Sequence, residues 1–127
     1  MDKLIAEAKM AREKAYAPYS NFKVGAAVLT SDGKIFTGCN VENSSYGLSI
    51  CAERIAMFNA VSSGYKEFTE IAVVTDSEPP SSPCGACRQV IFEFGDDIEV
   101  IMANLKGDTK KMTINELLKD GFKISKT

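Results

Sequence analysis

The sequence predicts an α/β fold of three layers, in which helices pack on both faces of a mixed central sheet of about five strands. Two observations favour this class. Short apolar runs typical of buried strands alternate with amphipathic segments of about a dozen residues. The turn signal Ser31-Asp32-Gly33 joins the first two runs into an antiparallel hairpin, so the sheet is not purely parallel. At 127 residues, the chain is expected to form a single domain, residues 1–127.

The N-terminal half is expected to hold two helices and the hairpin. Asp2 to Ala15 carries apolar residues at helical spacing. Val24 to Leu29 is a nearly continuous apolar run, and Lys34 to Gly38 returns beside it as a second strand. Gly25 is small for a strand position, which often marks a close approach by another backbone or a ligand. The second helix is expected from Ala52 to Ser62.

The C-terminal half repeats this alternation. The expected elements are a short buried strand from Ile71 to Thr75, a loop from Asp76 to Pro83, a third helix beginning at Cys84, a strand from Ile98 to Ala103, an edge strand from Thr109 to Thr113 and a short helix from Ile114 to Leu118.

Charge and hydropathy exclude several classes of partner. The net charge is −2 and the lysines are scattered, whereas a domain that binds phosphate backbones normally has a clustered basic surface. We therefore expect no nucleic acid and no membrane as partner, but a small molecule. The apolar runs are too short to span a bilayer, and Met1-Asp2-Lys3 does not open a signal peptide, which favours a cytoplasmic location.

The chain has four cysteines and no histidine, which narrows its possible chemistry. Histidine is the commonest metal ligand and a frequent general base. Without it, acid–base chemistry near neutral pH must come from a carboxylate, a cysteine or a metal-bound water. In the cytosol, such a set of cysteines indicates metal binding or catalysis more often than disulfides.

Three of the cysteines fall at the starts of expected helices. Cys51 opens the second helix, and Cys84 and Cys87 lie in the first turn of the third, three residues apart on one face. Helix N-termini stabilise thiolates, so two facing helix starts would hold three sulfurs around a soft cation. Zinc suits these donors and carries no redox chemistry of its own. Three protein ligands leave the fourth position open for water, as in catalytic zinc sites.

Glu53 is the candidate proton carrier for that water. Residues two apart on a regular helix point to nearly opposite sides, so Cys51 and Glu53 can both face the metal only if Cys51 caps the helix. The alternative is a solvated glutamate in the first turn, a position that the helix dipole also favours.

Two other interpretations of the cysteines remain open at this point. Cys39 lies at the end of an expected strand, where a lone cysteine usually packs as a small buried hydrophobic residue. If it were instead a fourth zinc ligand, the zinc site would be structural. Cys84-Gly85-Ala86-Cys87, taken alone, also looks like a thioredoxin-type redox motif. The chain has no tryptophan and no proline after that motif, and this interpretation gives Cys51 no role.

The motifs taken together resemble a known family. Cys51-Ala52-Glu53, followed by Pro83-Cys84-Gly85-Ala86-Cys87, resembles the signature of the zinc-dependent cytidine deaminases in its all-cysteine variant. Phe22 to Ala27 is similar to the first strand of that family, and Gly38 to Asn43 resembles its nucleoside-binding segment. The similarity extends over nearly the whole chain.

The resemblance implies the small class of the family, which acts on free nucleosides and forms homotetramers. The implied reaction is hydrolytic deamination of cytidine and deoxycytidine to uridine and deoxyuridine plus ammonia, in pyrimidine nucleoside salvage. Cys51, Cys84 and Cys87 would hold one zinc ion per subunit, which lowers the pKa of a water molecule towards 7. Glu53 would move protons between this water, N3 of the ring and the departing amine.

The resemblance also implies a substrate-binding set of Phe22, Asn40, Glu42, Tyr46, Ala52 and Phe122. Asn40 and Glu42 would hydrogen-bond the sugar hydroxyls, and Phe22 would pack against the pyrimidine. Tyr46 and Phe122 would reach into the site of a neighbouring subunit. A deaminase of a cytosine-containing antibiotic is the nearest alternative within the family, and the pair Asn40 and Glu42 favours ordinary nucleosides.

Three charged side chains are expected to influence the site. Zinc with three thiolates carries a formal charge near −1, and Arg54, three residues after Cys51, would offset it by donating hydrogen bonds to the sulfurs. Arg88, four residues after Cys84, is a second candidate for this role. The carboxylate of Glu42 would repel a nearby phosphate, so the sequence predicts nucleosides over nucleotides.

Overall fold

The computed structural model describes residues 2–124, and its helices and strands follow the predicted order. The elements are α1 (Asp2–Arg12), β1 (Val24–Thr30), β2 (Ile35–Cys39), the short 3-10 helix η1 (Tyr46–Leu48), α2 (Ala52–Ser62), β3 (Phe68–Thr75), α3 (Gly85–Glu93), β4 (Glu99–Asn104), β5 (Thr109–Thr113) and α4 (Ile114–Leu117). The bounds of α2 and β5 are those expected, and η1 was not predicted.

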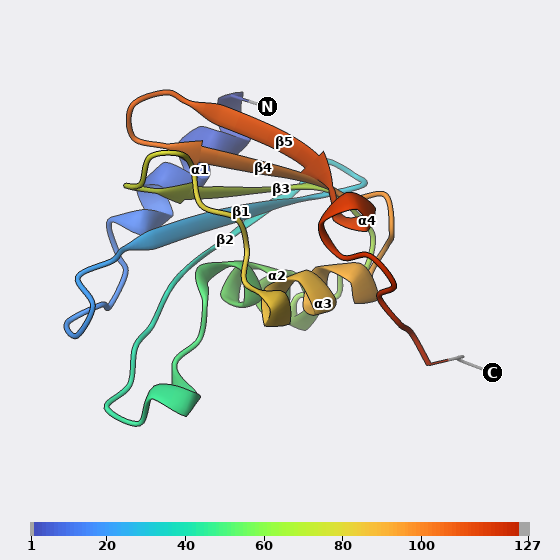
Figure 1. Ribbon diagram of the computed structural model, residues 1–127. Helices are drawn as coiled ribbons and strands as arrows, with labels where there is room; N and C mark the ends of the chain where they lie inside the picture. The colour runs from blue at the N-terminus through green and yellow to red at the C-terminus, as the bar shows by residue number, and fades with distance from the viewer. Residues whose placement is uncertain (1, 125–127) are drawn as a thin grey trace.

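The strands form one mixed sheet in the order β2-β1-β3-β4-β5 (Figure 1). β1 pairs antiparallel with both β2 and β3, whereas β3 pairs parallel with β4. β5 closes the sheet as an antiparallel edge strand beside β4. A parallel pair needs a crossover connection, which α3 provides between β3 and β4. The predicted mixed sheet and the predicted hairpin are therefore confirmed.

Helices cover both faces of this sheet, which confirms the three predicted layers (Figure 1). On one face, Leu4 and Ala8 of α1 pack into a cluster with Ala72 of β3. On the other face, Met57 of α2 and Ile91 of α3 belong to the larger core cluster. Burial of each large side chain among these, such as Leu4, Met57 or Ile91, contributes about 1.5–3 kcal/mol. Successive side chains along each strand point to opposite faces of the sheet, so β1, β3 and β4 each contribute to both core clusters.

Two glycines let helices approach the strands closely. A Cβ atom at Gly25 of β1 would lie 2.0 Å from the carbonyl oxygen of Ala8 in α1. A Cβ atom at Gly38 of β2 would lie 2.4 Å from the backbone nitrogen of Ala56 in α2. Both neighbours are backbone atoms, which cannot move aside as a flexible side chain can. The close approach expected at Gly25 is thus confirmed, and it is made by a helix backbone.

α1 ends at Arg12, three residues earlier than expected. The chain beyond it tightens into turns with hydrogen bonds between residues three apart, such as that from Lys14 N–H to the Ala11 carbonyl at 3.0 Å. Tyr16 N–H then donates to the Asn40 carbonyl at 3.0 Å. The bond joins this segment to the one that follows β2, so tertiary contacts rather than helical periodicity decide where α1 stops.

The starts of β3 and α3 also differ from expectation, and the ends of several other elements are shifted by one residue. β3 begins at Phe68 rather than Ile71, because Glu70 and Phe68 continue the pairing with β1, opposite Leu29 and Thr30, across an irregularity in the register. α3 begins at Gly85, and Cys84 is its N-cap rather than its first helical residue. Within residues 2–124, no helix has the length and apolar character needed to cross a membrane.

Candidate active site

A cavity of about 220 Å³ lies at the end of the sheet where β3 stops and β1 begins. Val24 at the start of β1 pairs with Thr75 at the end of β3, and the N-termini of α2 and α3 reach the same place. The cavity is lined by Phe22, Val24, Asn40, Cys51, Ala52, Glu53, Val73, Thr75, Ser81, Ser82 and Cys84. Positive ends of two helices thus meet the end of a buried strand, an arrangement that suits an anionic cluster or a polar ligand.

Helix capping places two of the three sulfurs. Cys51 is the N-cap of α2 and Cys84 is the N-cap of α3, both with extended backbone (φ −74°, ψ 153° and φ −68°, ψ 169°). N-cap residues usually use a side-chain oxygen to accept a helix N–H. Neither cysteine makes such a bond, so both sulfurs are free to bind elsewhere. Cys87, inside the first turn of α3, is fully buried beneath them.

The three sulfurs form one compact group. The Sγ atoms of Cys51, Cys84 and Cys87 all lie within 4.8 Å of one another, and those of Cys51 and Cys84 are 3.7 Å apart. Tetrahedral zinc with Zn–S bonds of about 2.3 Å would hold its sulfurs about 3.8 Å apart. The donor set and its spacing therefore fit zinc, with one corner left for a non-protein ligand.

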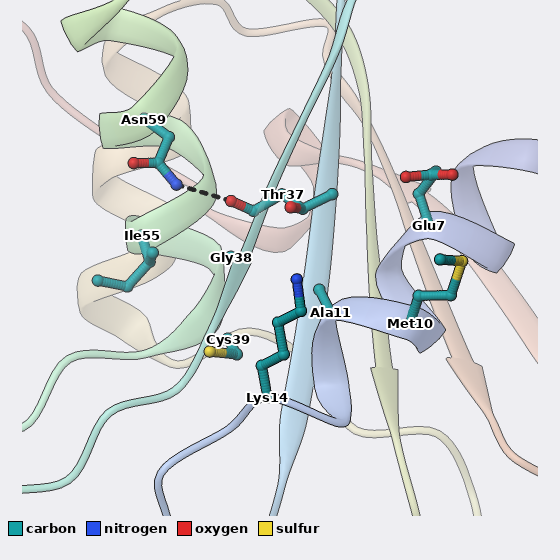
Figure 2. Close-up of a pocket in the computed structure, with 9 residues that line it drawn as sticks. All are labelled: Glu7, Met10, Ala11, Lys14, Thr37, Gly38, Cys39, Ile55 and Asn59. Atoms are coloured by element: carbon teal, nitrogen blue, oxygen red, sulfur yellow. Dashed lines mark hydrogen bonds between the residues drawn. The ribbon is translucent and has the colours of Figure 1, made fainter.

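Cys39 stands apart from this group. It lies on β2 in a separate groove of about 310 Å³ between α1, β2 and α2, where Figure 2 shows it below Gly38 and beside Lys14. Burial raises the pKa of the Cys39 thiol, and the Lys14 ammonium partly opposes that shift. Among the described residues, the sulfur group that could hold a metal does not include Cys39. The geometry thus gives no support to Cys39 as a fourth ligand.

The thiols of Cys51 and Cys87 have pKa shifts in opposite directions. A hydrogen bond donated by the Cys87 thiol is the main factor that lowers the pKa of Cys51 to about 5, and Arg54 and Cys84 lower it further against the effect of burial. The pKa of Cys87 is raised, because losing its proton would break that bond in a buried place. Arg54 Nη2 lies 3.6 Å from Cys51 Sγ, so a cation accompanies the first thiolate. The site thus favours an anionic sulfur even before a metal binds.

Glu53 is a buried carboxyl in the wall of the cavity, with only 5% of its surface exposed. Burial raises its pKa from the ordinary 4.5 to about 7, and the negative charge of Cys51 adds to the rise. Cys51 caps the helix, which is the condition under which both side chains can face one site. A carboxyl with a pKa near neutrality can accept and donate protons at working pH.

Three residues of the predicted substrate set line the cavity: Phe22, Asn40 and Ala52. The side chain of Asn40 also braces the cavity wall, since its Oδ1 accepts the Val24 N–H at 2.9 Å. Its Nδ2 donates to the Phe22 carbonyl at 2.8 Å. An amide has two acceptor sites and two hydrogens, so one of each remains for a ligand.

Glu42 is not among the residues that line the cavity of the single chain. Its carboxylate accepts hydrogen bonds from Tyr19 N–H at 3.0 Å, from Ser20 N–H at 3.2 Å and from the Ser20 hydroxyl. The Ser20 hydroxyl is the main factor that holds the pKa of Glu42 below its usual range. The carboxylate is therefore fixed in place and remains ionised.

Tyr46 and Phe122 also lie outside the cavity of their own chain. Tyr46, in η1, is 64% exposed and packs edge-on against Tyr19 with ring centroids 6.3 Å apart. Phe122 is 67% exposed, and its carbonyl accepts a hydrogen bond from the Gln89 side chain at 2.9 Å. Both aromatic side chains are thus mostly exposed on the surface of the single chain.

Sequence reasoning missed several polar residues of the cavity, Thr75, Ser81 and Ser82. Their signal was available, because Thr75 ends a buried strand and the two serines directly precede Pro83-Cys84. Arg88 was considered for the sulfurs, but its guanidinium donates to the carbonyls of Pro83 and Leu117, both at 2.8 Å.

Comparison with known proteins gives a consistent picture. Residues 1–103 match the model of the family described as "Cytidine and deoxycytidylate deaminase zinc-binding region". A cytidine deaminase from Sporosarcina psychrophila is 56% identical over 123 residues, which cover 96% of this chain and 90% of that protein. A cytidine deaminase from Halalkalibacterium halodurans is 52% identical over 120 residues, 94% of this chain and 91% of that one. The crystal structure of cytidine deaminase from Burkholderia pseudomallei matches with a TM-score of 0.93 and 57% identity, covering 95% of this chain and 98% of that chain.

Proposed function

Because the chain belongs to the cytidine and deoxycytidylate deaminase family, we propose that it hydrolyses cytidine and deoxycytidine to uridine and deoxyuridine. Ammonia is the second product, and the reaction serves pyrimidine nucleoside salvage. The observation that carries the proposal is the group of three cysteine sulfurs beside the buried carboxyl of Glu53. A structural zinc site would have no use for that carboxyl, and a dithiol oxidoreductase would have none for Cys51.

Cys51, Cys84 and Cys87 hold the zinc ion, and Glu53 moves the protons. Bound zinc supplies Lewis acidity that makes a water molecule nucleophilic near neutral pH. Glu53 accepts a proton as the water oxygen adds to C4 of the pyrimidine, and it donates that proton to N3. A second transfer through Glu53 carries the proton of the new C4 hydroxyl to the amino group. The C4–N bond then breaks, the C4 carbonyl forms and ammonia leaves. In the metal-free chain, burial raises the pKa of Glu53 to about 7, so the carboxyl is not committed to its charged form and can take and return a proton.

The substrate sits with its ring in the cavity and its sugar towards Asn40 and Glu42. Phe22 packs against the pyrimidine, and Ala52 forms the wall next to Cys51. The remaining amide hydrogen of Asn40 donates to a sugar hydroxyl oxygen, and the ionised carboxylate of Glu42 accepts from a sugar O–H. A hydroxyl can do both, because it is a donor and an acceptor. Glu42 also repels a phosphate on the sugar, so cytidine should be preferred to its monophosphate.

The active unit is a homotetramer whose sites lie near subunit interfaces. The exposed Tyr46 and Phe122 support this proposal, because large exposed aromatic side chains are typical of surfaces that another protein covers. Each of the two reaches the site of a neighbouring subunit and completes the enclosure of the substrate. We further propose that residues 1–127 act as one domain and that the protein works in the cytosol, where free thiols persist.

The test is ammonia release from cytidine by the purified protein and two variants. Glu53→Gln should keep its zinc and lose about 10²–10⁴-fold in kcat, the usual range for a general acid–base group. Cys39→Ser should keep both zinc and activity, because Cys39 lies outside the sulfur group. Full activity in the Glu53 variant, or zinc loss in the Cys39 variant, would contradict the proposal. Turnover of a cytosine-containing antibiotic in preference to cytidine would favour the alternative within the family.

A further inference from the structure

The segment that presents Cys84 is an irregular loop, residues 76–83, between β3 and α3. Hydroxyl groups link the end of β3 to both halves of the loop: Thr75 Oγ1 lies 2.9 Å from Ser77 Oγ, which lies 2.8 Å from Ser81 Oγ. Cys84 itself is exposed at the far end of the loop, and its side chain does not cap the helix. Besides the contact of its sulfur with Cys51 Sγ at 3.7 Å, the backbone on either side of Cys84 sets the position of the side chain.

Arg88 holds that backbone at two consecutive carbonyls. Its N–H donates to the Cys84 carbonyl at 3.0 Å, as the first hydrogen bond of α3. Its Nε donates to the Pro83 carbonyl at 2.8 Å. Pro83 is buried and lacks an N–H, so it cannot be anchored by donating a bond of its own. A single residue thus fixes the peptide groups before and after the Cα of Cys84.

The same guanidinium reaches a third backbone group on a distant element. Arg88 Nη1 donates to the carbonyl of Leu117, the last residue of α4, at 2.8 Å. The neighbouring Gln89 donates to the Phe122 carbonyl at 2.9 Å. Two consecutive residues of α3 therefore hold the end of α4 and the segment that follows it. The end of α4 and the Cys84 loop are both anchored by Arg88.

The chemistry of the bond favours arginine. A guanidinium has donors that diverge in one rigid plane, so it can serve two carbonyls in different directions, which a lysine ammonium on a flexible stem does less well. Hydrogen bonds from a charged donor are also stronger than neutral ones. Arg88 is half-buried, which limits competition from water. Arg54 differs from it because Arg54 donates to a sulfur.

We propose that Arg88 is a positioning residue for the metal ligand Cys84, which it holds through the Pro83 carbonyl while the Leu117 carbonyl holds Arg88 itself. Its effect is on how long zinc stays bound rather than on the chemical step. The inference rests on the zinc role proposed above. Residues that orient metal ligands from behind typically change metal affinity or activity by about 10–100-fold when replaced.

The experiment compares the rates at which zinc-loaded proteins lose the metal to a chromogenic chelator. Arg88→Gln should release zinc at least about tenfold faster than wild type. Arg88→Lys, which can serve one carbonyl, should fall between the two. Asn59→Ala is the matched control, because it removes the bond from Asn59 Nδ2 to the Thr37 carbonyl, 2.8 Å, outside the sulfur site (Figure 2). Its release rate should equal that of wild type.

Release from both Arg88 variants at the rate of the Asn59 variant would overturn the inference and leave the proposed function intact. A wild-type protein that takes up no zinc would overturn the proposed function together with the inference. If Arg88→Gln does not fold, the lysine variant decides, since its release must still exceed that of the control. Equal melting temperatures with unequal release rates would separate metal retention from general stability.

Discussion

The guanidinium of Arg54 lies 3.6 Å from the sulfur of Cys51, measured from Nη2 to Sγ, and the two residues share the first turn of α2. The contact places a positive charge beside a ligand set whose three thiolates would leave zinc with a formal charge near −1. A hydrogen bond to sulfur reduces the electron density that the thiolate gives the metal, so the metal remains a useful Lewis acid.

Arg54→Gln should therefore keep zinc but lower kcat by about tenfold, within the range seen when partners of metal ligands are removed. Arg54→Lys retains the charge and should lose less. In the metal-free glutamine variant, the pKa of Cys51 should be higher than in wild type. The Cys87 thiol is the main group that lowers this pKa, and Arg54 lowers it further. Thiolate absorbance followed against pH measures this shift. An unchanged kcat in the glutamine variant would remove Arg54 from the site's electrostatics.

The buried Glu53 predicts how the stability of the metal-free protein depends on pH. Its pKa is about 7 in the folded chain against an ordinary 4.5, so the folded state binds the proton more tightly than the unfolded state. The resulting stabilisation is fully present below pH 4.5 and is lost as pH rises through about 7. Between these limits the loss is about 3 kcal/mol.

Glu53→Gln cannot titrate, so the stability of its metal-free form should fall less between about pH 4.5 and pH 8 than that of wild type. Urea unfolding of both proteins at several pH values measures the difference, and the other titrating groups cancel in the comparison. If the free energy of unfolding depended on pH in the same way for both proteins, the environment of Glu53 would not disfavour its charged form.

Ser20 should control the charge of Glu42. The Ser20 hydroxyl is the main factor that lowers the pKa of Glu42, so Ser20→Ala should raise that pKa towards its usual value. If Glu42 binds the sugar as a carboxylate, KM for cytidine should increase as pH falls through its pKa, and the increase should begin at higher pH in the variant. The pH dependence of KM for both proteins measures this. A KM that is insensitive to acid in both would exclude a role for the Glu42 charge.

Sharing of sites between subunits can be tested by mixing two defective variants. A site built from Glu53 of one subunit and Phe122 of another is intact when a Phe122→Ala subunit adjoins a Glu53→Gln subunit. Co-expressed mixtures should therefore be more active than the sum of the separate variants. Glu53→Gln mixed with Cys84→Ser is the control. Each site takes its Glu53 and its Cys84 from one and the same subunit, so every site in this mixture keeps one of the two defects. No gain in the first mixture would argue against Phe122 at a neighbour's site.

The motif-bearing parts of the site could be predicted because each motif is short and lies at the start of one helix. Cys84 and Cys87 share one helix turn, and Cys51 opens a helix, so local rules place all three at helix starts. Sequence reasoning also stated the condition for Glu53 to face the metal, that Cys51 caps α2, and the structure meets it.

Contacts with backbone acceptors could not be predicted, because a carbonyl has no sequence signature. Arg88 looked like a partner for sulfur but bonds the carbonyls of Pro83 and Leu117, one of them on an element far away in sequence. The end of α1 was placed too late for a related reason. The bond from Tyr16 N–H to the Asn40 carbonyl belongs to the tertiary structure, and helical periodicity does not report it.

The most direct measurement of the central claim is removal and return of the metal. Protein stripped of zinc by a chelator should release no ammonia from cytidine, and equimolar zinc should restore the rate of the untreated enzyme, with about one ion bound per chain. Deamination at an unchanged rate by protein shown to be free of metal would contradict the account.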